Sequence, residues 1–276
     1  MNLPPTLERA PLAAPPRHRR RRMRESTRRA LLGTASVAAL LVVWQGLGAT
    51  GLLSPRDVSS PLRMLAAGAG RWGDGDLERH LVISGEEFGL GMLAATALSI
   101  PLGLLLGWYR RLRYLVEPLL MTAYSMPRDA FLPLIIVMLG LGITSRAALA
   151  FLGAVFPIVV NTMAGIRTID RMLVRVARSF GAGDREVFTK ILLPATLPYI
   201  MAGIRLGIGR ALIGVIVAEM YVSVAGLGSL IMAAQAGLNT DALVFVTLTT
   251  SAIGFVVLTL SRRIEARVVP WKPSDL

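Results

Sequence analysis

The stretch VARSFGAGDREVFTKILLP, from Val176 to Pro194, interrupts a chain that is otherwise largely apolar. It carries charges of both signs, so it is too polar to cross the hydrocarbon layer of a membrane. Gly181 and Gly183 divide it into two segments, and each segment has apolar residues at helical spacing. The sequence therefore predicts two short amphipathic helices that are joined by a sharp turn and flanked by apolar segments.

The first short helix is expected to begin after Asp170, whose carboxylate can accept a hydrogen bond at the helix N-terminus. Its expected apolar face is Leu173, Val176, Ala177 and Phe180, and its expected basic face is Arg171, Arg175 and Arg178. Asp184 is expected to cap the second helix, which Pro194 and Pro198 close. This periodicity fits an interfacial hairpin on lipid headgroups and a docking element for a soluble partner equally well.

The apolar residues on both sides of this stretch come in blocks of about 20, the length that crosses about 30 Å of hydrocarbon as a helix. The chain is 54% hydrophobic, with a mean hydropathy of +0.59. Six apolar segments are predicted, at about residues 31–51, 82–108, 115–140, 147–165, 198–222 and 241–261. We therefore expect an all-α polytopic membrane protein with about six transmembrane helices. The glycine pairs Gly85–Gly89, Gly103–Gly107 and Gly203–Gly207 predict close helix packing.

The positions of the basic residues predict the orientation of the chain in the membrane. With the N-terminus placed in the cytoplasm, 22 of the 30 lysines and arginines fall in cytoplasmic segments and 5 in external loops. This asymmetry predicts that both termini are cytoplasmic. It also accounts for the net charge of +13, so nucleic-acid binding is not expected.

Four regions are predicted along the chain. Residues 1–30, rich in proline and then in arginine, are expected to form a disordered basic cytoplasmic tail, with an arm for nucleic acid or anionic lipid as the alternative. Residues 31–79 are expected to hold an uncleaved first transmembrane helix and an external loop. Residues 80–262 are expected to form the main transmembrane domain, and residues 263–276 a cytoplasmic C-terminal tail.

The residue types that are missing narrow the function further. The chain has no cysteine, and neither of its lysines, Lys190 and Lys272, follows a glycine, so the phosphate-binding G-K-[ST] motif is absent. No pattern typical of a metal site, a cofactor site or a catalytic residue set is present. We therefore expect a protein that is not an enzyme and that receives any chemical energy through a partner.

The spacing in the opening stretch resembles the EAA loop of bacterial ABC importer permeases, which reads E-A-A, three residues, G, nine residues, I-x-L-P. Arg175, Val176 and Ala177 stand at the first three positions, Gly181 at the glycine, and ILLP at residues 191–194. The first two positions depart from the pattern, because Arg175 replaces the acidic residue and Val176 an alanine. The stretches MPRDAFLP (126–133), AEM (218–220), AGLG (225–228) and RRIEARVVPW (262–271) resemble the nitrate/sulfonate/taurine branch of these type I importers.

The resemblance implies an ABC permease that forms the translocation path for a small solute, such as a sulfonate, taurine, nitrate or a similar anion. It implies docking of a separate ATPase on a coupling helix, at Arg175, Ala177, Arg178, Gly181, Asp184, Glu186, Ile191 and Pro194. The partners it implies are a cytoplasmic ABC ATP-binding subunit, an extracytoplasmic solute-binding protein, a second permease copy in a homodimer, and membrane lipid. The implied location is the bacterial cytoplasmic (inner) membrane.

Charged residues inside the apolar segments are candidates for the translocation path. Arg128 and Asp129 lie deep in the third segment between Pro127 and Pro133, where they form either a salt bridge or a path-lining site for an anion. Glu219 lies near the outer end of the fifth segment, where it makes either a surface hydrogen bond or part of a gate. The rival hypothesis to the importer is a stand-alone secondary transporter or channel, which needs no ATPase.

Overall fold

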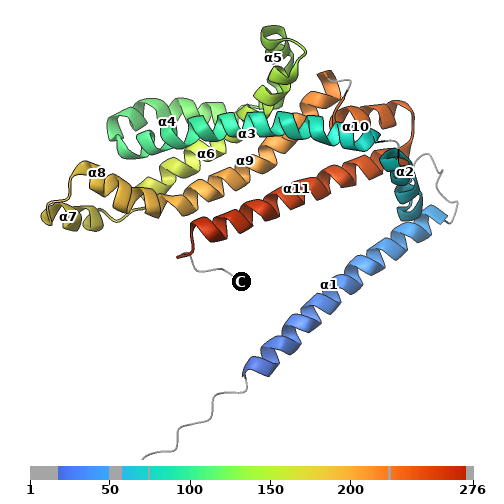
Figure 1. Ribbon diagram of the computed structural model, residues 1–276, viewed down its shortest axis with the longest axis horizontal. Helices are drawn as coiled ribbons and strands as arrows, with labels where there is room; N and C mark the ends of the chain where they lie inside the picture. Colours follow the sequence, from blue (N-terminus) through green and yellow to red (C-terminus); the bar gives the residue numbers. More distant parts are fainter. Residues whose placement is uncertain (1–17, 50–57, 74, 223–224, 272–276) are drawn as a thin grey trace, which may run out of the picture. The chain divides into compact units, whose positions relative to one another are not determined.

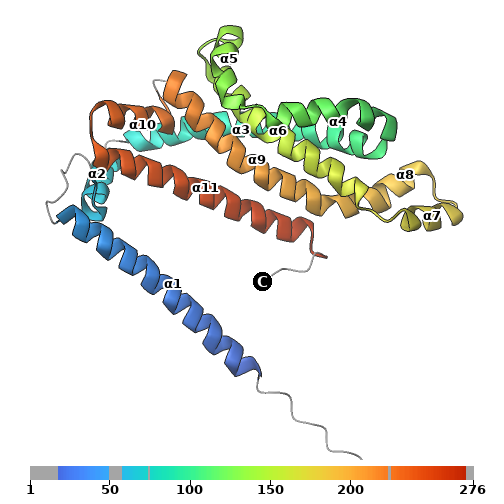
Figure 2. The same cartoon turned by 180° about the vertical axis from the view of Figure 1, so that it is seen from behind.

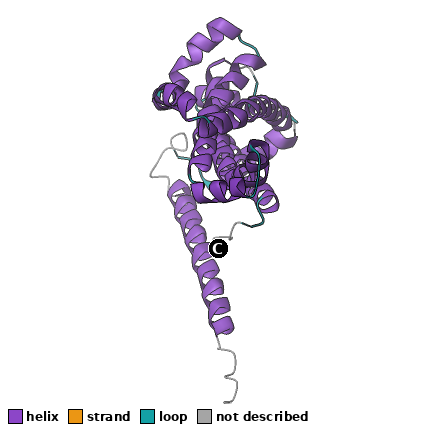
Figure 3. Cartoon of the chain, turned by 90° about the vertical axis from the view of Figure 1, so that its left-hand side faces the viewer, coloured by secondary structure: helices purple, strands orange, loops and turns teal. Residues whose placement is uncertain are grey.

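The computed structural model describes residues 18–49, 58–73, 75–222 and 225–271. These residues form helices and turns, with no strand among them, which confirms the all-α class (Figure 3). The chain divides into two compact units, residues 1–54 and residues 55–276, and each is described by itself.

The first unit contains α1 (His18–Ala49). The helix begins well before the apolar segment predicted at 31–51, so it includes residues 18–30, which the sequence assigns to a disordered tail. No glycine or proline occurs between His18 and Leu32, and arginine has a high helix propensity, so nothing in this segment stops the helix. Residues 1–17 of the predicted tail lie outside the described residues.

The helices of the second unit are, in chain order, α2 (Pro61–Gly73), α3 (Asp76–Trp108), α4 (Arg110–Ser125), the 3₁₀ helix η1 (Arg128–Phe131), α5 (Leu132–Leu139), α6 (Ile143–Arg167), α7 (Arg171–Ser179), α8 (Asp184–Glu186), the π-helix η2 (Val187–Leu192), α9 (Leu193–Val222), α10 (Leu227–Ala236) and α11 (Thr240–Val268). We use "loop end" for the end of the unit that carries α7 and α8, and "opposite end" for the end that carries α10 (Figure 1).

Helix α6 lies at the centre of this unit and packs along both α3 and α9 (Figures 1 and 2). Its buried residues form the main core together with residues of the two neighbours, among them Ala95 and Leu106 of α3 and Ala211 and Val215 of α9. Helix α11 packs on α9, α10 contacts α9, α11 and α3, and α2 packs on α11 and α3. The arrangement makes α6 the element that holds its two long neighbours together.

Five helices in the described part of the chain are long and apolar enough to cross a membrane. They are Leu31–Gly48, Asp76–Trp108, Ile143–Arg167, Asp184–Val222 and Thr240–Val268. The segment predicted at 115–140 is divided instead into α4, η1 and α5. Pro127 lacks a backbone N–H and restricts the residue before it, and Met126 accordingly has an extended backbone (φ −69°, ψ 142°).

Glycines allow the backbones of the three central helices to approach closely. A Cβ atom added at Gly91 of α3 would lie 2.5 Å from the carbonyl oxygen of Ala147, and one at Gly214 of α9 would lie 2.8 Å from that of Leu149. The predicted pairs Gly103–Gly107 and Gly203–Gly207 also lie at contacts with α6. The predicted pair Gly85–Gly89 does not, since a Cβ atom at either position meets nothing within 4 Å. Small residues thus set the helix spacing at α6.

Replacing Gly91 with leucine is expected to destabilise the bundle, because the side chain meets the backbone of α6, which cannot move aside as a flexible side chain would. We expect a cost of about 1–3 kcal/mol or more, as for other overpacked sites. The matched control is Gly85→Leu on the same helix, where the added side chain meets open space. Thermal unfolding of the purified protein in detergent measures the difference, and equal midpoints for the two variants would contradict this packing argument.

Candidate functional site

The opening stretch forms two helical segments at the loop end, as the sequence predicts. The carboxylate of Asp170 accepts a hydrogen bond from the backbone N–H of Met172 (2.8 Å), which caps α7. Gly181 has a φ of +85° and makes the turn after α7. A side chain at this backbone angle would be strained, which explains the requirement for glycine.

The second segment differs from the prediction, because it does not end at Pro194. Helix α8, the π-helix η2 and α9 run on without a break from Asp184 to Val222, and both Pro194 and Pro198 lie inside α9. The wider π turn ends at Leu192, two residues before Pro194, whose ring and missing N–H disturb a regular α-helix. The cap also differs, since Gly183 and not Asp184 is the N-cap residue.

The predicted coupling residues gather at this end, and most of them are exposed. Arg178 and Asp184 form an ion pair across the turn (2.8 Å), and Glu186 accepts hydrogen bonds from Lys190 (2.8 Å) and from the N–H of Gly183 (3.4 Å). Arg175 is exposed, and the bond it donates goes to the sulfur of Met172. Ala177, Ile191 and Pro194 are half-buried. The exposed ion pairs add little stability, so they chiefly order the turn.

The apolar face of α7 lacks cover within the described chain. Met172, Leu173 and Val176 are exposed, and Phe180 at the end of the helix is 87% exposed. Burying a side chain of this kind contributes about 1.5–3 kcal/mol. A compact cluster of such side chains, next to exposed arginines, is a surface suited to a protein partner.

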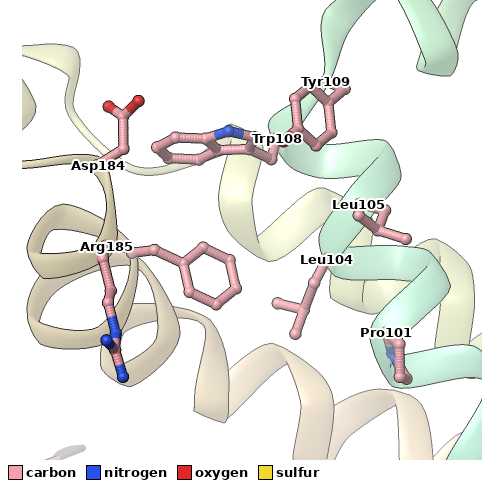
Figure 4. Close-up of a pocket in the computed structure, with 8 residues that line it drawn as sticks. Pro101, Leu104, Leu105, Trp108, Tyr109, Asp184 and Arg185 are labelled. Carbon is pink, nitrogen blue, oxygen red and sulfur yellow. The ribbon is translucent and has the colours of Figure 1, made fainter.

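Helix α3 contacts the loop through its last turn, and this contact is missing from the sequence prediction (Figure 4). The rings of Trp108 and Phe188 meet edge to face, with centroids 6.0 Å apart and planes at 89°. A cavity of about 500 Å³ lies beside them. Its lining residues are Pro101, Leu104, Leu105, Trp108 and Tyr109 on one side and Asp184, Arg185 and Phe188 on the other. The loop is therefore tied to α3 as well as to α9, with which it is continuous.

Arginines line a second cavity at the loop end, of about 410 Å³. Arg110 and Arg113 come from the start of α4, Arg167 from the end of α6, and Arg171 from the start of α7. Glu117 pairs with Arg113 (3.7 Å) and Arg167 (3.0 Å). The bond that Arg110 donates to the exposed phenol of Tyr114 lowers the pKa of that group. This end of the unit is strongly basic.

The charged residues predicted in the third segment lie at the break between α4 and α5. A guanidinium N–H of Arg128 donates to the carbonyl oxygen of Gly153 on α6 (3.0 Å). Arg128 is half-buried and Asp129 is exposed, and the two do not form an ion pair with each other in the described structure. The break thus places a guanidinium beside the middle of α6.

Glu219 lies in a buried polar cluster at the opposite end, and its side chain is fully buried. Its carboxylate accepts hydrogen bonds from the hydroxyl of Ser84 (2.5 Å) and from the N–H of Gly228 (2.7 Å). Ser84 in turn accepts from the N–H of Leu227 (2.9 Å). Side chains of α3 and α9 therefore bind the free N–H groups at the start of α10.

The same cluster contains three residues that the sequence reasoning missed as partners. His80 accepts from the N–H of Gly226 (2.8 Å), and Glu87, which is fully buried, pairs with Arg146 of α6 (3.0 Å). His80, Ser84 and Glu87 are spaced i, i+4, i+7 and so share one face of α3. This row of polar side chains on one face of an otherwise apolar helix is the sequence feature that indicates a buried polar cluster. Side chains of α3 and α9 thus fix the start of α10, and the pair of Glu87 with Arg146 joins α3 to α6 beside them.

Comparisons with known proteins identify this architecture. The family model described as "Binding-protein-dependent transport system inner membrane component" matches residues 99–270, more than half of the chain. The taurine transport system permease protein TauC of Escherichia coli (strain K12) is 29% identical over 250 residues, which cover 89% of this chain and 91% of TauC. The putative aliphatic sulfonates transport permease protein SsuC of Bacillus subtilis (strain 168) is 32% identical over 237 residues, with 86% of each chain covered.

Among solved structures, the inward-facing MetNI methionine ABC transporter has the same fold, with a TM-score of 0.60 and 19% identity. The match covers 70% of this chain and 95% of that one. The family match and the sequence relatives agree with the long apolar helices and the loop described above. The chain therefore belongs to the family of binding-protein-dependent transport system inner membrane components, and it is the permease subunit of an ABC importer and not an enzyme.

Proposed function

We propose that the chain imports a small anion of the sulfonate, taurine or nitrate class, and that residues 175–194 couple its helices to the ATPase. Membership of the family already implies an ATP-binding subunit and a substrate-binding protein as partners. The observation that carries the coupling role is the uncovered apolar face of α7, with Phe180 87% exposed, beside exposed arginines at the loop end. The names of TauC and SsuC support the substrate class.

The coupling mechanism follows from the continuity of the loop with the bundle. Helices α8, η2 and α9 form one continuous helical run. A displacement of the turn at Gly181 is therefore passed on to the whole of α9. The contact between Trp108 and Phe188 passes the same displacement to α3. An ATPase bound to α7 can therefore bias two arrangements of the helices, as alternating access requires.

We further propose that two copies of the chain pair around the path and that lipid covers the remaining apolar surface. Within a single copy, Arg128 is half-buried and Asp129 is exposed, near the middle of the membrane-spanning part. Charges at this depth are too costly to face lipid. A second copy of the chain covers these charged side chains and forms the other side of the translocation path. The exposed apolar side chains along α11, such as Phe255 and Val256, suit contact with lipid.

The proposed orientation places the loop end and both termini in the cytoplasm. The arginine-lined cavity at the loop end and the 22 to 5 distribution of basic residues along the sequence support it. The buried cluster around Glu219 and the start of α10 then lies at the external side, where the substrate-binding protein is expected. The side of the membrane from which an impermeant reagent reaches residue 179 decides this orientation.

Removing the apolar anchor of α7 is expected to weaken ATPase docking. Phe180→Ser and Gly181→Val should each reduce affinity for the ATP-binding subunit by roughly 30-fold, equivalent to about 2 kcal/mol at an interface hot spot. Co-purification with the ATPase and transport-coupled ATP hydrolysis are the measurements. Val256→Ser, at an exposed apolar residue in the middle of α11 and away from both ends of the unit, is the control. Unchanged docking and hydrolysis in both loop variants, with normal membrane insertion, would exclude this coupling role.

We infer that Glu219 contributes to transport indirectly. It holds α10 against α3 and α9 at the outer end of the translocation path. Glu219→Ala leaves the N–H of Gly228 and the hydroxyl of Ser84 without their acceptor, at a cost on the order of 1–3 kcal/mol for each group. We expect faster hydrogen exchange of the amides at residues 227–236 and slower uptake, with Glu219→Gln intermediate because it keeps one acceptor oxygen.

The control for this experiment is Glu86→Ala, which removes an exposed carboxylate from the same region of α3. It should leave the exchange of α10 unchanged. If Glu219→Ala also leaves the exchange of α10 unchanged, the cluster does not fix that helix and the role inferred for Glu219 is wrong.

A further inference from the structure

Two arginines from different segments lie at the same residue of α6, Arg128 through its side chain and Arg210 through its backbone. The guanidinium of Arg128 donates to the carbonyl oxygen of Gly153 (3.0 Å). Gly153 also packs against the backbone of Arg210 on α9, where a Cβ atom added to Gly153 would lie 2.6 Å from the carbonyl oxygen of Arg210. The break in the third segment and the crossing of α6 with α9 therefore bring both arginines to one level of the unit.

That level is the middle of the membrane-spanning part. Gly153 follows Ile143, the first residue of α6, by ten positions and precedes Arg167, the last, by fourteen. At 1.5 Å per residue it lies about 15 Å from one end of the helix and about 21 Å from the other. A charge at this depth costs a few kcal/mol unless it is paired or faces a water-filled cavity.

Neither arginine is neutralised within the described chain. Arg128 makes one hydrogen bond to a neutral carbonyl, although a guanidinium has five N–H groups. The side chain of Arg210 is exposed and makes no hydrogen bond or ion pair with the described residues. Arg205, on the same helix, differs, because it pairs with Glu265 of α11 (2.5 Å). Within the described chain, Arg205 therefore has an acidic partner, whereas N–H donors of Arg128 and Arg210 are left available.

We propose that Arg128 and Arg210 together form an anion-recognition site at the middle of the translocation path, which binds the oxyanion group of the substrate, such as a sulfonate. Guanidinium groups present paired N–H donors that match the oxygen geometry of such anions. Asp129, exposed beside Arg128, limits the net positive charge, which favours release of the anion after binding. This inference rests on the proposed function, since it assumes that the exposed face at this level lines the path.

The experiment uses the full complex of the chain with its ATP-binding subunit in proteoliposomes, supplied with the substrate-binding protein, and uptake of labelled taurine and ethanesulfonate as probes. Arg128→Gln, Arg210→Gln and the double variant are expected to lower the initial uptake rate by about tenfold or more. Arg128→Lys and Arg210→Lys keep the charge and should retain more uptake. Assembly of the complex should stay unchanged in all variants. Arg263→Gln, which removes an exposed charge at the end of α11, is the control.

A chemical rescue separates charge from side-chain shape at Arg210, because the chain contains no other cysteine. Arg210→Cys should lose uptake, recover it with a thiol reagent that adds an aminoethyl group, and stay inactive with one that adds a sulfonatoethyl group. Equal recovery with both reagents would overturn the inference. So would uptake by the double glutamine variant at the wild-type rate.

The outcomes for the inference and for the proposed function are distinct. If the wild-type complex and the glutamine variants assemble and import both probes equally well, Arg128 and Arg210 do not form an anion site. The proposed function as an importer is then unaffected. If the wild-type chain does not assemble with an ATPase at all, the proposed coupling fails. If the glutamine variants lose assembly in step with uptake, the arginines are structural and the inference is overturned.

Discussion

The close approach of the α6 backbone to α3 and α9 is the constraint on which the rest of the structure depends. Gly91, Gly153 and Gly214 let these helices approach so closely that a single added Cβ atom would meet backbone. Helices that share no hydrophobic driving force in lipid gain stability from such contacts. The three helices therefore form a tightly packed core. The loop at residues 175–194, the arginines Arg128 and Arg210, and the buried cluster around Glu219 are all attached to this core.

Each functional feature uses one part of that unit. The loop at residues 175–194 continues directly into α9 and touches α3 through Trp108, so a partner bound outside the membrane can act on the core. The third segment breaks at Pro127, and the break carries Arg128 to the middle of α6. At the opposite end, Glu219 uses the crossing of the same helices to hold α10. The proposed coupling loop, the proposed anion site and the buried cluster that holds α10 are thus attached to different parts of the same three helices.

Much of this arrangement could be predicted from local sequence pattern. The apolar segments predict the all-α membrane class, Asp170 and Gly181 predict the ends of α7, and the spacing from Gly181 to Pro194 indicates the family. Two local predictions were wrong: Pro194 and Pro198 lie inside a continuous helix that has a π turn shortly before Pro194, and residues 18–30 are helical because neither glycine nor proline interrupts them. The partners of Glu219 and the meeting of Arg128 with Gly153 depend on helix pairing, which periodicity along one chain does not reveal.

One introduced cysteine can test whether the loop end faces the cytoplasm and is covered by the ATPase, since the chain has no cysteine of its own. Ser179→Cys, at an exposed residue beside Phe180 that leaves the apolar anchor of α7 intact, would be treated with a membrane-impermeant maleimide in inside-out and right-side-out vesicles, with and without the ATP-binding subunit. We expect labelling only in inside-out vesicles, and strong protection when the ATP-binding subunit is bound. Labelling from the external side, or equal labelling with and without the bound subunit, would contradict this expectation.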